Sequence, residues 1–466
     1  MNPELPARRF HFNPATLLEL LRMSLPMVIS QGAFAVMIFT DRFFLAQISP
    51  AHMAAALGGG VAWYFSISLF NGVIAYANAL VAQYLGARQY DKCARVVTQG
   101  LLMSLLCVPI LMLLAWLVGG IFAGMGHAEE QVALEKSYFM ILMLGSVFTL
   151  MKVALASFFS GTGRTRVVMT CDVLGVFVNI PLSYALVFGK AGLPALGISG
   201  AAIGTVISTV FSLVLFLAVY LQKSNRIRFM IRQSLHFDPG IMRRYIRLGL
   251  PSGLEMFLNI AAFNLFLLMF QSYGITEAAS AAIVFNWDIL SFVPMMGLSI
   301  AVMSLIGRYV GAGDMTKTHE VTTSGYILGL AYSSMLALIF IVFRTEFVEL
   351  FIFSEDRAGD IRILASFMMA GLATYVLAEG VLQVASGVLR GAGDTRWIMI
   401  ASVSLHWAML VAQYFIIKVF AIDPRVSWLV FVLMILMIAI TFIVRLKGSR
   451  WRSPERLRRI LAEDII

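Results

Sequence analysis

The sequence predicts an all-α membrane protein of twelve transmembrane helices arranged as two six-helix halves. The first observation is composition: 60% of the 466 residues are hydrophobic and 13% are charged, whereas soluble domains carry about 25% charged residues. The second is a series of apolar runs, each long enough to cross a bilayer. The third is an internal repeat, in which residues of the first half recur 225 positions later.

The apolar runs are placed by length, because a helix needs about 20 apolar residues to span the hydrocarbon core. Six runs precede a basic linker and six follow it. They lie at 17–48, 54–85, 97–122, 136–160, 167–189, 198–222, 245–272, 278–312, 322–344, 362–389, 397–419 and 426–446. An even number of spans puts both termini on the same side of the membrane.

The first run, 17–48, combines a proline and an acid. Pro26 lies well inside it and lacks a backbone donor, so we expect the helix to bend there. Asp41 follows fifteen residues later, about 22 Å along the axis. A carboxylate at that depth costs several kcal/mol unless it faces a cavity, a partner or a proton. Asp41 is therefore a candidate functional residue.

The repeat matches these features in the second half. Arg22, Leu25 and Pro26 recur as Arg247, Leu250 and Pro251, so a second bend is expected at Pro251. Two halves of six spans have the same orientation, which predicts a pseudo-two-fold axis along the membrane normal. The expected domains are an N-terminal lobe (1–222), a cytoplasmic basic linker (223–244), a C-terminal lobe (245–446) and a cytoplasmic basic tail (447–466).

The net charge of +10 is distributed unevenly. Of the lysines and arginines, 26 fall in segments on the side of the N-terminus and six fall in loops on the other side. This bias predicts that both termini are cytoplasmic and excludes nucleic acid as the reason for the charge. The three cysteines have no metal-binding or disulfide spacing, and no cleaved signal peptide is expected.

Ionisable residues inside the predicted spans are the candidates for function, because such groups are costly there. Glu255 and Asn259 are four residues apart, hence on one helix face. Lys152 lies in the middle of a span, where it forms an internal ion pair or extends to the interface. A bare carboxylate at such depth can carry a proton, whereas one ringed by oxygens can hold Na⁺. The acids are Asp41, Asp172, Glu255, Asp288 and Glu379. Asp172 is only a few residues into its span, so we expect it at the cytoplasmic edge of the membrane.

Three motifs carry a family resemblance. They are LVAQYLGA at 80–87, NIPLSYALVFG at 179–189 followed by GLPALGISGAAIGT at 192–205, and VLRGAGDT at 388–395. The chain resembles, over essentially its whole length, the multidrug and toxic compound extrusion (MATE) family, in its bacterial NorM- or DinF-like form. The resemblance implies two six-helix lobes forming a V around a central cavity. It also implies export of lipophilic, often cationic compounds in exchange for H⁺ or Na⁺.

The resemblance also assigns roles to residues. Asp41, Asn179 and Thr205 match a cation or proton site of the first, fifth and sixth helices, which makes Asp41 and Asn179 possible Na⁺ ligands. Ser183 stands where many members have Asp or Asn. In the second half, Asn259 replaces an acid of the seventh helix, while Glu379 matches the acid of the tenth. Glu255 is one turn from Asn259, and Asp288 has no family counterpart; these four form the expected substrate or second cation site.

We therefore expect an antiporter that exports organic cations in exchange for H⁺, with Na⁺ the less favoured coupling ion because acids are missing at Ser183 and Asn259. The alternative is a flippase of lipid or lipid-linked precursors from the same superfamily. No catalytic, ATP-binding or certain metal-binding motif is present, so neither an enzyme nor a cofactor is expected. We expect a monomer in the lipid bilayer of a bacterial cytoplasmic membrane.

Overall fold

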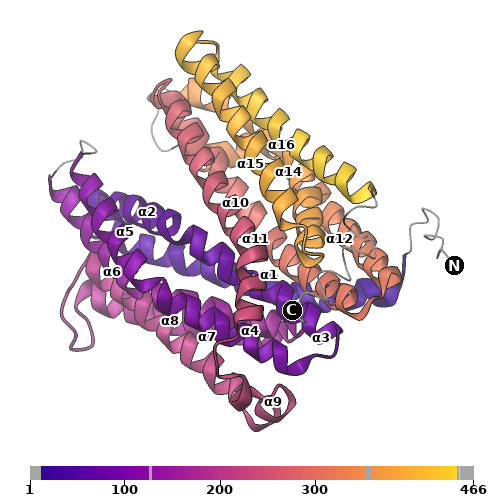
Figure 1. Cartoon of the computed structure of the whole chain (residues 1–466). Coiled ribbons are helices and arrows are strands. Elements are labelled where there is room, and N and C mark those ends of the chain that lie inside the picture. The colour runs from indigo at the N-terminus through magenta and orange to yellow at the C-terminus, as the bar shows by residue number, and fades with distance from the viewer. Residues whose placement is uncertain (1–11, 125–128, 353–357, 449–450, 452–466) are drawn as a thin grey trace. The chain divides into compact units, whose positions relative to one another are not determined.

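A computed structural model describes residues 12–124, 129–352, 358–448 and 451 (Figure 1). Within these ranges the chain is helical and has no strand. Twelve helical segments in the described ranges are long and apolar enough to cross a membrane. The predicted all-α class and the predicted number of spans are therefore confirmed.

The helices of the first half begin soon after the N-terminal segment. They are α1 (Pro14–Ala46), α2 (Pro50–Ala75), α3 (Ala77–Gly86), α4 (Tyr90–Leu106), α5 (Val108–Ile121), η1 (Phe122–Gly124), α6 (Glu129–Gly161), α7 (Thr165–Phe188) and α8 (Ile198–Tyr220). The linker forms α9 (Lys223–Arg228) and η2 (Ile231–Ser234).

The second half repeats this series. Its elements are α10 (Pro239–Gln271), α11 (Ile275–Ala312), α12 (Met315–Val342), α13 (Arg344–Glu349), α14 (Ala358–Gly391), α15 (Thr395–Tyr414), the π-helical turn η3 (Phe415–Val419) and α16 (Pro424–Lys447). Helices α1 and α10 have 33 residues each and begin 225 positions apart. Helices α2 and α11, and α4 and α12, also begin 225 positions apart. The register of the sequence repeat is thus also the register of the helices.

By its internal contacts the chain divides into two compact units. Unit 1 comprises Met1–Leu25, Gly86–Arg88 and Ala262–Ile466. Unit 2 comprises Pro26–Leu85 and Gln89–Ala261. Helices α1 and α10 each contribute to both units, and in α1 the change of unit falls at Pro26. Pro26 and Pro251 lie inside unbroken helices, and the bends expected at them stay predictions, as do the predicted lobe boundaries.

Polar contacts fix the first turns of α1 within unit 1. Glu19 accepts a hydrogen bond from the hydroxyl of Tyr309 (2.7 Å) and lies 3.3 Å from Nη1 of Arg308. One turn earlier, Thr16 Oγ1 donates to Glu320 (2.5 Å), which also pairs with Lys317 (2.8 Å). These contacts explain why the start of α1 belongs with α11 and α12.

The start of α10 is held in unit 2 by a second set of polar contacts. Arg244 donates to Oε1 of Gln83 (2.9 Å), and the Tyr245 hydroxyl donates to the carbonyl of Ile74 (2.6 Å). Just before the helix, burial of Asp238 is outweighed by hydrogen bonds from the backbone of Ile241 and from Arg95, which hold the pKa of Asp238 below its usual range.

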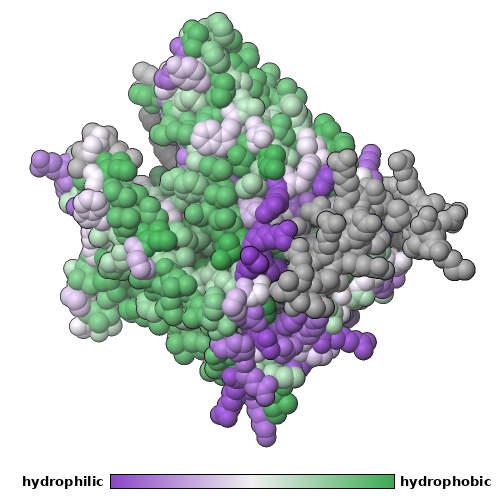
Figure 2. Space-filling model, in the orientation of Figure 1, coloured by the Kyte–Doolittle hydropathy of each residue, from purple (hydrophilic) through white to green (hydrophobic). Residues whose placement is uncertain are grey.

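The core of each unit is aromatic. In unit 1, Trp428, Phe431 and Tyr375 are buried, and Phe266 stacks on Phe431 with ring centroids 4.8 Å apart. In unit 2, Phe158 and Phe159 are fully buried between α4, α6 and α8. Figure 2 shows that apolar residues cover the flanks of the helices, whereas hydrophilic residues gather around α9 and the helix ends beside it. This surface is that of a helical membrane protein.

Candidate functional site

The predicted residues of the first half meet at one place in unit 2. Asp41 of α1 is 3% exposed, and Asn179 and Ser183 of α7 are fully buried. Thr205 Oγ1, on α8, donates a hydrogen bond to Oδ2 of Asp41 (2.8 Å). Asn179 Nδ2 donates to the hydroxyls of Ser183 (3.2 Å) and Thr205 (3.5 Å). Ser183 and Asn179 border the same carboxylate, so two helices, α7 and α8, surround Asp41 with neutral polar groups.

The close packing of α7 and α8 explains how these groups reach one another. Asn179 and Ser183 are four residues apart and therefore lie on one face of α7. Gly204, next to Thr205 on α8, faces Ser183: a Cβ atom at position 204 would lie 2.5 Å from Ser183 Oγ and 3.1 Å from its Cα. Glycine at this position lets α8 approach closely enough for Thr205 to reach Asp41.

Two oxygen atoms of this site have no hydrogen-bond donor among the residues that the structure describes. They are Oδ1 of Asp41 and Oδ1 of Asn179, both buried. Among the described residues, no lysine or arginine forms an ion pair with Asp41. Its neighbour in sequence, Arg42, lies beside the phenol of Tyr138 on α6. A buried acceptor without a donor costs about 1–3 kcal/mol, so a further hydrogen-bond donor or a cation would stabilise this site.

A second acidic site lies in unit 1. Asp288 of α11 and Glu379 of α14 are close enough to repel each other, and Tyr375, one turn before Glu379, lies beside Asp288. In this conformation Asp288 Oδ1, Glu379 Oε2 and the Tyr375 hydroxyl make no hydrogen bond within the described part of the chain. Glu379 is 9% exposed. The sequence did not single out Tyr375, although its spacing of four residues from Glu379 marks a shared helix face.

The two remaining residues of the expected second site belong to the other unit. Glu255 and Asn259 are on the part of α10 that belongs to unit 2, whereas Asp288 and Glu379 belong to unit 1. Glu255 is buried, with 6% of its surface exposed. The grouping of all four residues into one site stays a prediction.

A further polar cluster in unit 2 was only partly anticipated. Lys152 of α6 forms an ion pair with Asp172 of α7 (3.2 Å), so the internal-pair alternative for Lys152 is the one found. Ser30 of α1 donates to the other oxygen of Asp172 (2.5 Å). Ser30 lies eleven residues, about three turns, before Asp41 and therefore on the same face of α1. This spacing from Asp41 was the sequence feature that could have identified Ser30 as part of the same polar face.

Comparison with known proteins identifies the family. The profile of the MatE family matches residues 26–185 and 251–416, one stretch in each half. The two stretches begin at Pro26 and Pro251, 225 positions apart, as the internal repeat requires.

Solved structures share the fold. A MOP superfamily transporter from Pyrococcus furiosus, described as having a binding pocket of reversed polarity, superposes with a TM-score of 0.85 at 20% identity, covering 94% of this chain and 97% of its own. An outward-facing multidrug resistance MATE transporter superposes with a TM-score of 0.84 at 19% identity, covering 95% of this chain and 100% of its own. The eukaryotic MATE transporter AtDTX14 superposes with a TM-score of 0.85 at 18% identity, covering 97% of this chain and 99% of its own.

These matches confirm the MATE fold expected from the motifs at 80–87, 179–205 and 388–395. They do not distinguish the NorM- or DinF-like form, which stays a prediction. Because the family profile covers more than half of the sequence and recurs in both halves, this chain belongs to the MatE family of membrane transporters.

Proposed function

We propose that this transporter is a proton-coupled antiporter that exports lipophilic organic cations, with Asp41 as the residue that exchanges protons. The observation that carries the proposal is the environment of Asp41: a buried carboxylate bonded to a hydroxyl, with one oxygen lacking any donor and no cationic partner among the described residues. A carboxylate held in this way in a membrane carries an energetic penalty that a bound proton removes.

A proton fits the unsatisfied atoms of the site better than Na⁺ does. One proton on Oδ1 of Asp41 turns a buried acceptor that has no donor among the described residues into a donor, and the site holds a second such acceptor, Asn179 Oδ1. Hard metal cations in proteins are held by about six or more oxygen ligands. Asn179 turns its amide nitrogen, not its oxygen, toward Ser183 and Thr205, which reduces the oxygens facing one point.

The charges of the membrane core support cationic cargo. Asp288 and Glu379 bring two carboxylates together in unit 1 without an ion pair to a described base. The one lysine deep in unit 2, Lys152, is neutralised by Asp172. A flippase of pyrophosphate-linked lipids would need basic groups for its anionic cargo, so the acids favour export of cations over the flippase alternative.

The transport cycle follows from these assignments. Asp41 takes a proton from the outside and releases it inside, and the acids of unit 1 attract the organic cation that leaves. As the helices that carry these residues move, the proton and the organic cation occupy their sites in turn. We propose that the protein works as a monomer in a bacterial cytoplasmic membrane, with both termini inside.

Purified protein in proteoliposomes tests the coupling ion. Efflux of a fluorescent lipophilic cation is measured under an imposed pH gradient at equal Na⁺, and under an imposed Na⁺ gradient at equal pH. We expect the pH gradient to drive transport and the Na⁺ gradient to have no effect. Asp360 is an exposed acid at the start of α14. The variant Asp360→Asn is therefore the matched control for substitutions of the buried carboxylates. Transport driven by Na⁺ alone would overturn the proposal.

A further inference from the structure

The linker between the two halves is an anchored structure of its own. Asn225 of α9 accepts a hydrogen bond from Arg164 (2.7 Å) and donates to the carbonyl of Val219 (2.7 Å). Phe229 is 2% exposed and packs edge-on against Phe158, with ring centroids 4.9 Å apart. The buried residues of the linker therefore hold it against the ends of α4, α6 and α8.

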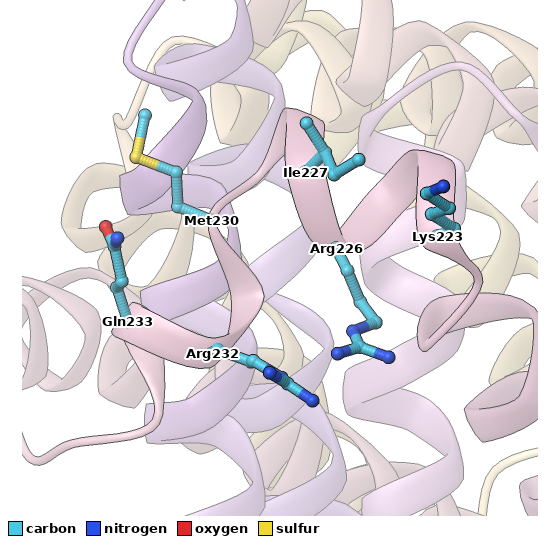
Figure 3. A pocket seen from close by; sticks show the side chains of 6 residues that line it. All are labelled: Lys223, Arg226, Ile227, Met230, Arg232 and Gln233. Atoms are coloured by element: carbon cyan, nitrogen blue, oxygen red, sulfur yellow. The ribbon is translucent and has the colours of Figure 1, made fainter.

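The opposite side of the linker forms a pocket of about 530 Å³ (Figure 3). Its lining is half cationic and half uncharged: Lys223, Arg226, Ile227, Met230, Arg232 and Gln233. Met230, between α9 and η2, has a φ of 48°, in the left-handed region that L-residues rarely adopt. This turn folds η2 back, and Figure 3 shows the guanidinium groups of Arg226 and Arg232 extending into the same space.

The cationic side chains of this pocket have no counter-charge within the described part of the chain. Among the described residues, no carboxylate pairs with Lys223, Arg226 or Arg232. Arg228, in the same short segment, is instead turned onto the ring of Tyr90, 5.3 Å from its centroid. Within the linker, Arg228 therefore packs against an aromatic ring, whereas the other three cations face the open pocket.

The apolar part of the lining is exposed rather than buried. Ile227 is 67% exposed and Met230 47% exposed, although both are large apolar residues. Helix α9 begins three residues after the end of the membrane-spanning α8, so the pocket lies at the level where the chain leaves the membrane. Exposed apolar side chains beside unpaired cations at this level are the composition of a surface that binds anionic lipid.

We propose that this pocket binds the phosphate headgroup of an anionic phospholipid. Arg226, Arg232 and Lys223 contact the phosphate, and Ile227 and Met230 contact the first carbons of the acyl chains. Topology alone accounts for positive charge on this side of the membrane, but it requires neither a formed pocket nor exposed apolar residues in it. A free phosphate ion would use the cations and leave the apolar side chains without a role.

The test compares lipid binding to the full-length protein in detergent, measured by native mass spectrometry with phosphatidylglycerol and phosphatidylcholine. We expect phosphatidylglycerol to be retained preferentially. The double variant Arg226→Ala/Arg232→Ala should weaken its binding roughly 30-fold, since each basic residue near a membrane surface contributes about 1 kcal/mol. The control, Arg166→Ala/Arg243→Ala, removes two exposed arginines at the same end of the helices and should change binding less than threefold.

Two further measurements separate the lipid from other anions. Ile227→Ser should weaken phosphatidylglycerol binding several-fold and leave any binding of glycerol phosphate unchanged. Arg226→Lys/Arg232→Lys should keep part of the affinity, and an unchanged thermal midpoint in detergent shows that the variants are folded. Equal losses in the pocket and control variants, or displacement of the lipid by millimolar inorganic phosphate, would overturn the proposal.

Discussion

The acidic sites of the two units differ although the helices that carry them are repeated. In unit 2 a single carboxylate, Asp41, lies among hydroxyl and amide groups. In unit 1 two carboxylates, Asp288 and Glu379, face each other beside a tyrosine. At the repeat offset of 225 residues, Asp41 corresponds to Phe266, which stacks in the aromatic core of unit 1. Asp288 corresponds to Trp63, which donates to Ser146 (2.9 Å).

This comparison shows that the duplicated halves kept their scaffold and diverged in their chemistry. Pro26 and Pro251 and the starts of three helix pairs keep one offset, whereas no buried acid of these sites is retained. In unit 2, the binding or release of one proton changes the whole charge of the site, because Asp41 is its one acid. Each of the paired acids makes the negative charge of the other more costly, because the medium has a low dielectric constant. The two sites therefore suit different tasks.

The largest effect is expected at the lone acid. Asp41→Asn removes the one group of its site that changes charge, so proton-coupled export should fall at least 100-fold. The measurement is uptake of a fluorescent lipophilic cation into everted vesicles under a pH gradient, with Asp360→Asn as the control that keeps full activity. Coupled export by Asp41→Asn would show that the site in unit 2 is not the coupling site.

The paired acids are expected to substitute for each other. Asp288→Asn and Glu379→Gln should each lower export of a cation by less than about fivefold, because the remaining acid keeps the charge. The double variant should lower it about 100-fold, while an uncharged substrate is affected little. A double-mutant cycle on initial rates measures this coupling. Fold-changes that simply multiply would show that the two carboxylates act independently.

The close approach of α7 and α8 in unit 2 can be tested at Gly204. Gly204→Ala places a methyl group against Ser183, and overpacking of this kind costs about 1–3 kcal/mol. We expect a lower thermal midpoint in detergent together with reduced export. Gly32→Ala is the control, since a Cβ atom there has no heavy atom within 4 Å. Equal midpoints for the two variants would refute the packing argument.

The smallest effect concerns the hydroxyl that bonds Asp41. Thr205→Val keeps the shape of the side chain and removes the donor to Oδ2, a bond of about 1.5–3 kcal/mol with a charged acceptor. Export should fall about tenfold, whereas Thr205→Ser should keep most of the activity. Initial rates measured from pH 6 to 8 provide the comparison. Identical rates for the valine and serine variants would remove Thr205 from the mechanism.

Sequence reasoning succeeded where the signal is local or repeated. Hydropathy located the spans because each must be about 20 residues long, and matched residues such as Pro26 and Pro251 located the duplication. The cluster of Asp41, Asn179, Ser183 and Thr205 came from the family resemblance. The positions of polar residues in the sequence do not by themselves indicate that α1, α7 and α8 pack together.

What could not be predicted depends on which faces of distant helices pack together. Lys152 and Asp172 were visible as single intramembrane charges, but their pairing needs the rotation of α6 against α7. Asp288 and Glu379, 91 positions apart, were grouped in the expected second site, but only the packing of α11 on α14 shows that their carboxylates lie close together. Pairings of this kind are set by helix packing in three dimensions, not by sequence spacing.

The division of α1 between the two units has a consequence for how the protein is synthesised. Nearly all of unit 2 is complete once residue 261 has been made, but the start of α1 belongs to unit 1. Glu19 has its partner Arg308 289 positions later. At about 5–20 residues per second, the ribosome needs roughly 15–60 s to cover that interval. For that time Glu19 lacks its partner Arg308, and the last unit to assemble must recruit a segment that was translated first.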